Sequence, residues 1–348
     1  MTVTTSIPIV DISAEGIDQV QVAKELVDAA VEYGFVYIRN AGRDISTEYL
    51  ENAFNISKIL FKSPLEDKQR CKIEKNNQGW SGMHSETLDP KTQRVGDFKE
   101  AFNFGPFADN KATQPIPQSI ESHQAQLAAF KDACHDLCRK LLLLFGIGLG
   151  VNPPDFFTAA HASHETSGSI LRLLYYPPPS STPTALESDV RAGAHSDYGS
   201  VTLLFRLRGQ AGLELLDPRT ETWAPVPVVP PGTENDAQPP ILVNIGDLLS
   251  YWTNGLLRST VHRVAFTSTP ADGESALDPR YSIAYFCHPA DATPLGPVPG
   301  ERVAAYQPNG SSSSSNPYAE RKVMTAKEHL HMRLRATYLE MYENSEEK

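Results

Sequence analysis

Between residues 169 and 289 the chain is a series of short β-like segments separated by proline and glycine, and this pattern constrains the fold most strongly. Each segment is rich in leucine, β-branched or aromatic residues and has the usual length of a strand. The candidate strands are Ile170–Tyr176, Gly193–Asp197, Ser200–Arg206, Leu213–Leu216, Trp223–Val228, Ile241–Ile245, Ser259–Phe266 and Tyr281–Cys287. So many short strands favour a double-sheet jelly roll, with a site at the mouth where strand ends converge. We therefore predict a mainly β fold with flanking helices around a double-stranded β-helix (jelly-roll) core.

Helical patterns flank this predicted core. Apolar residues repeat with the helical period over residues 22–31, and again along one face of residues 122–145. A final helix is expected over residues 325–338. We predict one integrated catalytic unit made of an N-terminal α/β region (1–120), a long packing helix and connection (121–168), the jelly-roll core with its sites (169–300) and a C-terminal helix (316–348).

The composition and charge indicate which kinds of molecule the protein can bind. The net charge of −11 and the sequence pI of about 5.4 give no electrostatic footprint for nucleic acid or anionic lipid. From the first residues we expect no secretory signal, and no apolar run approaches the roughly 20 residues of a membrane helix. The four cysteines show no disulfide framework, which indicates a reducing compartment. We expect a cytoplasmic protein with a small-molecule substrate, and the sequence leaves the oligomeric state open.

Two histidines and one aspartate form a candidate metal site. His195 and Asp197 are two positions apart in a predicted strand, so both side chains would point to the same side. His262 lies in another apolar segment. Two imidazoles and one carboxylate are the facial triad of non-haem Fe(II) oxygenases, which leaves open coordination positions for co-substrate and O2. The residue types therefore predict a site for Fe(II).

An arginine and a serine form a candidate carboxylate receptor. Arg280 and Ser282 also share one face of a predicted strand. A guanidinium group binds a carboxylate through two parallel hydrogen bonds, and a serine hydroxyl can add a third. A 2-oxo dicarboxylate would connect the two sites, chelating iron at one end and pairing with Arg280 at the other. The same Arg-x-Ser pair could instead bind a carboxylate of the substrate itself.

Several motifs resemble the iron(II)/2-oxoglutarate-dependent dioxygenases of the isopenicillin-N-synthase-like family, over nearly the whole chain. The matching stretches are Ile7–Ile12, Gly34–Ile38, Asp97–Phe102, Leu171–Pro177 and Val243–Leu249. Fungal members, among them the thymine hydroxylases, share further stretches with this chain. These are Ile170–Leu174, Val190–Gly193 and Arg280–Cys287. The resemblance implies Fe(II), 2-oxoglutarate as co-substrate and O2.

The resemblance also implies roles for individual residues. His195, Asp197 and His262 would hold iron, Arg280 and Ser282 would anchor 2-oxoglutarate, and Tyr176 would touch it. The residues expected to contact substrate are Arg172, Tyr198, Phe286 and Ser169. This chain departs from the family at two places: Leu174 stands where plant members have asparagine, and Ser169 stands where thymine hydroxylases have one.

We expect oxidation of a C–H bond, by hydroxylation or otherwise, in a small aromatic or cyclic molecule of fungal secondary metabolism. Three alternatives stay open. They are a thymine-type pyrimidine methyl hydroxylase, an oxidase of the same family that does not use 2-oxoglutarate, and a non-catalytic 2-oxoglutarate sensor.

Overall fold

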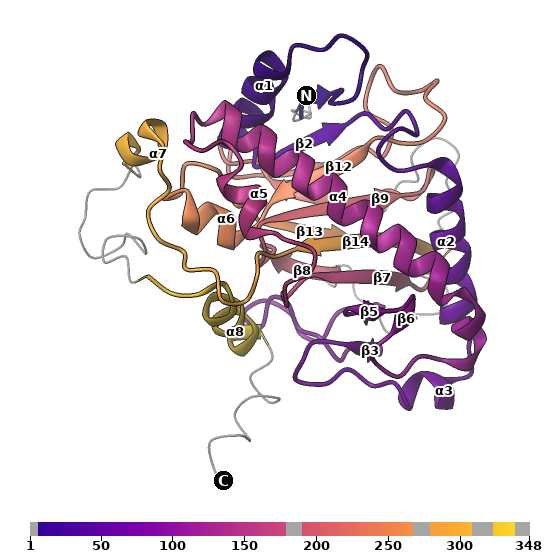
Figure 1. Cartoon of the computed structure of the whole chain (residues 1–348). Coiled ribbons are helices and arrows are strands. Elements are labelled where there is room, and N and C mark those ends of the chain that lie inside the picture. The colour runs from indigo at the N-terminus through magenta and orange to yellow at the C-terminus, as the bar shows by residue number, and fades with distance from the viewer. Residues whose placement is uncertain (1–5, 179–189, 267–278, 308–322, 338–348) are drawn as a thin grey trace.

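The computed structural model describes residues 6–178, 190–266, 279–307 and 323–337. In it two mainly antiparallel β-sheets face each other (Figure 1). In the described residues the larger sheet has the order β1 (Ile9–Val10), β2 (Phe35–Ile38), β12 (Ile241–Ile245), β9 (Val201–Arg206), β14 (Arg280–Cys287), β7 (Ile170–Tyr176), β4 (Glu100–Phe104) and β3 (Gly79–Ser81). The smaller sheet has the order β11 (Trp223–Pro225), β10 (Leu213–Leu216), β13 (His262–Ala265) and β8 (Val190–His195). A short hairpin joins β5 (Phe107–Ala108) to β6 (Lys111–Ala112).

Helices cover the outer face of the larger sheet, as Figure 1 shows for α4 across β12, β9, β14 and β7. In the described residues the helices of the whole fold are α1 (Gln19–Glu32), α2 (Thr47–Phe61), α3 (Leu65–Gln69), the 3-10 helix Gln118–His123, α4 (Gln124–Gly148), α5 (Phe156–Ala160), α6 (Asp247–Trp252), α7 (Glu301–Ala305) and α8 (Ala326–Thr337). The predicted apolar face of α4 is buried, and its Phe130 ring lies 5.3 Å from the ring of Phe205 on β9. The predicted mainly β fold with a jelly-roll core and flanking helices is confirmed.

The N-terminal region contributes strands to the larger sheet. Strand β2 pairs antiparallel with β12, and β4 pairs antiparallel with β7. Strands from both sides of residue 120 therefore belong to one sheet, and the division of the chain at residues 120, 168 and 300 stays a prediction. Of the predicted part 316–348, helix α8 is described, while the rest lies outside the described residues.

Three predicted strands end earlier than the sequence pattern indicated, since Gly193–Asp197, Trp223–Val228 and Ser259–Phe266 end at His195, Pro225 and Ala265. Strand β8 stops at His195, and Asp197 lies two residues beyond it rather than inside a strand. The reason is the pairing, because His195 opposite His262 is the last registered pair of β8 with β13. The chain then turns, and Ser200 donates its N–H to the carbonyl of Cys287 on the opposite sheet. This turn is what brings Asp197 to the pocket mouth.

Candidate metal centre and substrate pocket

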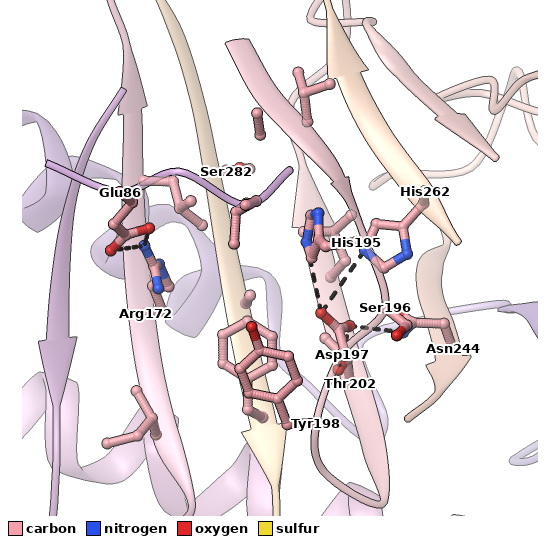
Figure 2. Close-up of a pocket in the computed structure, with 18 of the residues that line it drawn as sticks. Glu86, Arg172, His195, Ser196, Asp197, Tyr198, Thr202, Asn244, His262 and Ser282 are labelled. Atoms are coloured by element: carbon pink, nitrogen blue, oxygen red, sulfur yellow. Dashed lines mark hydrogen bonds and ion pairs between the residues drawn. The ribbon is translucent and has the colours of Figure 1, made fainter. Parts of the chain in front are cut away.

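The three predicted metal ligands converge at the mouth of the jelly roll. His195 is at the end of β8, Asp197 follows it, and His262 opens the neighbouring strand β13. Asp197 Oδ1 lies 3.9 Å from His195 Nε2 and 3.7 Å from His262 Nε2. One ligand atom from each residue lies within 4.8 Å of the other two (Figure 2). The chain thus brings together the donor set that non-haem iron requires.

The atoms that do not face the centre are already hydrogen-bonded. His195 Nδ1 bonds the carbonyl of Gly193 at 2.7 Å, and His262 Nδ1 bonds the carbonyl of Thr260 at 3.1 Å. A carbonyl accepts only from an N–H, so both rings carry their proton on Nδ1 and direct the Nε2 lone pair inward. The three side chains are therefore held in the form that binds a divalent ion.

The carboxylate of Asp197 is oriented in the same way. Its Oδ2 accepts hydrogen bonds of 2.7 Å from Thr202 on β9 and from Asn244 on β12, which leaves Oδ1 for the centre. Burial alone would raise the pKa of Asp197, but His262, His195 and these hydrogen bonds outweigh it and lower the pKa. Burial, together with the neighbouring His262, lowers the pKa of His195 to about 4. Near neutral pH the aspartate is thus charged and His195 is neutral, as metal ligation requires.

The predicted 2-oxoglutarate residues lie along one face of the larger sheet. Arg280, Ser282, Ala284 and Phe286 alternate along β14 and line the pocket. Arg280 donates through Nε to the carbonyls of Gln210 and Ala211, and Nη1 lies 3.4 Å from Ser282 Oγ. Its guanidinium carbon lies 4.7 Å from the centre of the Tyr176 ring. Arg280, Ser282 and Tyr176 are therefore neighbours in one pocket with the three candidate metal ligands.

Arg172, expected to contact substrate, lines the pocket from β7 on the same face as Leu174 and Tyr176. In the structure Arg172 is paired with the carboxylate of Glu86, which the sequence did not predict. Arg172 Nη2 lies 2.7 and 2.6 Å from the two oxygens of Glu86, in the segment between β3 and β4 (Figure 2). Lys99 Nζ lies 3.1 Å from Glu86 Oε2. The Arg172 end of the pocket, where substrate is expected, is thus a buried ion-pair cluster.

The other three expected substrate residues differ in position. Tyr198 and Phe286 line the pocket. Ser169 is not among the lining residues, and its hydroxyl instead bonds the backbone of His288, accepting from its N–H at 3.0 Å. The adjacent Gly168 and Ile170 line the pocket, so alternation along the chain turns the Ser169 side chain away from it.

The C-terminal helix supplies one wall of the pocket. Leu330 and Leu334 of α8 line it. Arg333 of the same helix pairs with Asp247 Oδ2 at 2.8 Å, and its guanidinium carbon lies 5.1 Å from the centre of the Tyr198 ring. Asp247 also accepts a hydrogen bond of 3.0 Å from Ser196, the residue between His195 and Asp197. The wall formed by α8 is therefore attached beside the candidate metal centre.

Sequence reasoning missed several residues of this site. Asn244 and Thr202 gave a usable signal, because a polar side chain in a mostly apolar, buried strand needs a hydrogen-bond partner. Glu86 gave none, since it lies in no periodic strand pattern and its partner Arg172 is 86 positions away. Lys99 lies two positions from its partner Asp97 in the matching stretch Asp97–Phe102, but nothing in that stretch pointed to Glu86.

A jelly roll with two imidazoles and one carboxylate at its mouth has the architecture and donor set of a non-haem Fe(II) oxygenase. The family model described as non-haem dioxygenase in morphine synthesis N-terminal matches residues 7–125. The 2OG-Fe(II) oxygenase superfamily model matches residues 167–289. The chain belongs to the 2OG-Fe(II) oxygenase superfamily and is an oxidoreductase that depends on iron and 2-oxoglutarate.

Known proteins resemble the chain over most of its length. A UPF0676 protein of Schizosaccharomyces pombe is 38% identical, with 84% of each chain covered. The 2-oxoglutarate-dependent dioxygenase htyE of Aspergillus rugulosus is 32% identical, over 80% of this chain and 86% of that protein. The crystal structure of the full-length Neurospora crassa thymine hydroxylase in complex with alpha-KG and thymine has a TM-score of 0.75 at 28% identity, covering 95% of this chain and 96% of that one. In the part of the chain that the structure describes, no helix is long and apolar enough to cross a membrane.

Proposed function

We propose that His195, Asp197 and His262 bind Fe(II), and that Arg280 and Ser282 anchor the distal carboxylate of 2-oxoglutarate beside Tyr176. The observation that carries this proposal is the orientation of the triad. In each of the three side chains the atom facing away is hydrogen-bonded, so one donor atom per residue is directed at a common point. Such outer hydrogen bonds fix ligand orientation in metal sites.

The substrate that this pocket fits is a small, flat molecule with a polar group. Tyr198 and Phe286 offer aromatic surface, Leu330 and Leu334 offer apolar surface, and Arg172 offers hydrogen-bond donors. When bound, Fe(II) with 2-oxoglutarate and O2 supplies the oxidising chemistry. The side chains of the pocket hold one C–H bond of the substrate toward the centre and limit the access of water.

A thymine-type methyl hydroxylase is a second candidate. It is favoured by the similarity to the Neurospora crassa thymine hydroxylase, whose structure with alpha-KG and thymine covers nearly the whole chain. The position of Ser169 argues against it, because its hydroxyl is bonded to the backbone of His288 and does not line the pocket. We therefore propose a different cyclic substrate, such as a secondary metabolite.

The test is an anaerobic titration of the protein with Fe(II) and then with 2-oxoglutarate, followed by visible absorption. We expect a weak charge-transfer band only when both are present. A protein that binds iron but gives no band with 2-oxoglutarate would contradict the proposed role of Arg280 and point to a substrate carboxylate there. A band without succinate formation in air, with any of a panel of cyclic substrates that includes thymine, would favour the sensor alternative.

A further inference from the structure

The pocket contains two arginines on one face of the larger sheet. Arg172 on β7 is opposite Ala284, and Arg280 on β14 is opposite Tyr176, so the two arginines are four positions apart along the paired strands. At about 3.3 Å per residue this separation is roughly 13 Å. Both line the same pocket. The pocket therefore has a guanidinium group at each end.

Glu86 covers the guanidinium at one of these ends. The side chain of Glu86 is only 3% exposed, and both of its oxygens accept from Arg172. Ser81 Oγ adds a hydrogen bond of 2.8 Å to Oε1, and Lys99 lies 3.1 Å from Oε2. The backbone of Glu86 is fixed too, since its carbonyl accepts from the N–H of Asp97 at 2.8 Å. The carboxylate is thus held on Arg172 by the surrounding protein before any ligand binds.

The cluster around Glu86 is balanced in charge. Asp97 pairs with Lys99, so that Glu86, Asp97, Lys99 and Arg172 contribute two negative and two positive charges. Burial alone would raise the pKa of Glu86, but Arg172 and Lys99 hold that pKa well below its usual range. Burial alone would lower the pKa of Lys99, but Asp97 and Glu86 raise it. The carboxylate of Glu86 and the ammonium of Lys99 therefore remain charged near neutral pH.

We propose that Glu86 determines specificity at both ends of the pocket. By neutralising the cations at the Arg172 end, it leaves the Arg280 end as the place for the distal carboxylate of 2-oxoglutarate. It also selects the substrate, because a substrate carboxylate at Arg172 would be repelled by the fixed carboxylate of Glu86. The substrate group that faces Arg172 is then a neutral acceptor, such as a carbonyl or amide oxygen. This inference rests on the proposed roles of the iron triad and Arg280.

The experiment is anaerobic calorimetric titration of 2-oxoglutarate into the Fe(II)-loaded full chain, comparing the wild type with Glu86→Gln. We expect one molecule of 2-oxoglutarate per wild-type chain. In Glu86→Gln, which keeps the side-chain shape, we expect a second, weaker binding event at Arg172 and Lys99. Inhibition of succinate formation at high 2-oxoglutarate should accompany it. The double variant Glu86→Gln/Arg172→Gln should return to one binding event, because it removes one cation together with the carboxylate.

Glu100→Gln is the matched control. Glu100 is a carboxylate in a buried ion pair with Lys68, also from the N-terminal region, but it does not line the pocket. The proposal is overturned if folded Glu86→Gln binds one 2-oxoglutarate as the wild type does, or if Glu100→Gln gains the same second event. A second result would overturn the proposal whether or not Glu86→Gln folds. It is a wild-type chain that binds a second molecule of 2-oxoglutarate, when Arg172→Gln abolishes that second binding event. Absence of any 2-oxoglutarate binding by the wild type would instead overturn the proposed function.

Discussion

The two ends of the pocket are built in different ways. At the iron and 2-oxoglutarate end, the proposed ligands come from strands β8, β13 and β14 and the turn after β8. At the substrate end, Glu86 and Lys99 come from the N-terminal region, while Leu330 and Leu334 come from the C-terminal helix α8. At the first end, His195 and Asp197, and likewise Arg280 and Ser282, are two positions apart in the chain. At the second end, Glu86 and its partner Arg172 are 86 positions apart. We therefore expect changes at the two ends to have separable effects on iron, co-substrate and substrate.

The largest effect should follow from Asp197→Ala. Removing this carboxylate leaves two imidazoles, and we expect loss of measurable Fe(II) binding and of succinate formation. Calorimetry with Fe(II) and a succinate assay measure both losses, and thermal unfolding checks that the variant is folded. Substantial turnover by this variant would show that Asp197 is not a metal ligand. The iron end of the pocket would then have to be assigned to other residues.

The next effect should follow from Arg280→Ala. A hydrogen bond to a charged group contributes about 1.5–3 kcal/mol, which corresponds to roughly a 10- to 150-fold weaker binding of 2-oxoglutarate. Fe(II) affinity should stay unchanged. The 2-oxoglutarate titration measures this shift, and Arg208→Ala, an exposed arginine just beyond β9, is the control. If Arg280→Ala binds 2-oxoglutarate with the dissociation constant of the wild type, Arg280 does not bind the co-substrate carboxylate.

Asn244→Ala tests whether the hydrogen bond from Asn244 to Asp197 contributes to metal affinity. Asn244 bonds Asp197 Oδ2 and does not contribute one of the three candidate ligand atoms. Loss of an outer hydrogen bond of this kind lowers metal affinity about 10- to 100-fold, and we expect the lower part of that range because Thr202 still holds the same oxygen. Direct Fe(II) titration provides the measurement. Unchanged affinity would mean that the turn after β8 orients Asp197 without help from β12.

The smallest effect should follow from Arg333→Gln on α8. The side chain of Arg333 is 35% exposed, and an ion pair of this kind is worth at most about 1 kcal/mol, or roughly a fivefold change. We expect faster hydrogen exchange in α8 and a few-fold higher KM for substrate, with 2-oxoglutarate affinity unchanged. Arg335→Gln, an exposed position on the same helix, is the control. A weaker 2-oxoglutarate affinity in Arg333→Gln would show that the two ends are not separable.

The difference between the two ends of the pocket explains which features the sequence could predict. The strands Ile170–Tyr176, Leu213–Leu216 and Ile241–Ile245 were predicted with their observed bounds, because apolar runs bounded by proline and glycine are local signals. The convergence of Arg280 and Ser282 in one pocket followed from the alternation of side chains along a strand. The predicted placement of Asp197 inside a strand was wrong, because the end of β8 is set by its pairing with β13.

The ion pair of Glu86 and the pocket wall formed by α8 could not be predicted in this way. Glu86 and Arg172 are 86 positions apart in sequence, and nothing in the spacing of either residue indicates the other. The C-terminal helix was predicted from its period, but periodicity does not say which surface a helix covers. Contacts of this kind are fixed by the packing of the whole chain.

The pairing of β2 with β12 has a consequence for how the chain folds. Ile38 is opposite Ile241, so this contact closes a loop of about two hundred residues. Closing such long loops costs chain entropy before the contact stabilises anything, and folds rich in these contacts form slowly. During synthesis the apolar residues of β2 emerge long before their partner strand exists. We therefore expect β2 to join the larger sheet only after β12 has left the ribosome, and the complete sheet to form only after β14 has followed it. Expression of the N-terminal part alone should give an aggregation-prone product.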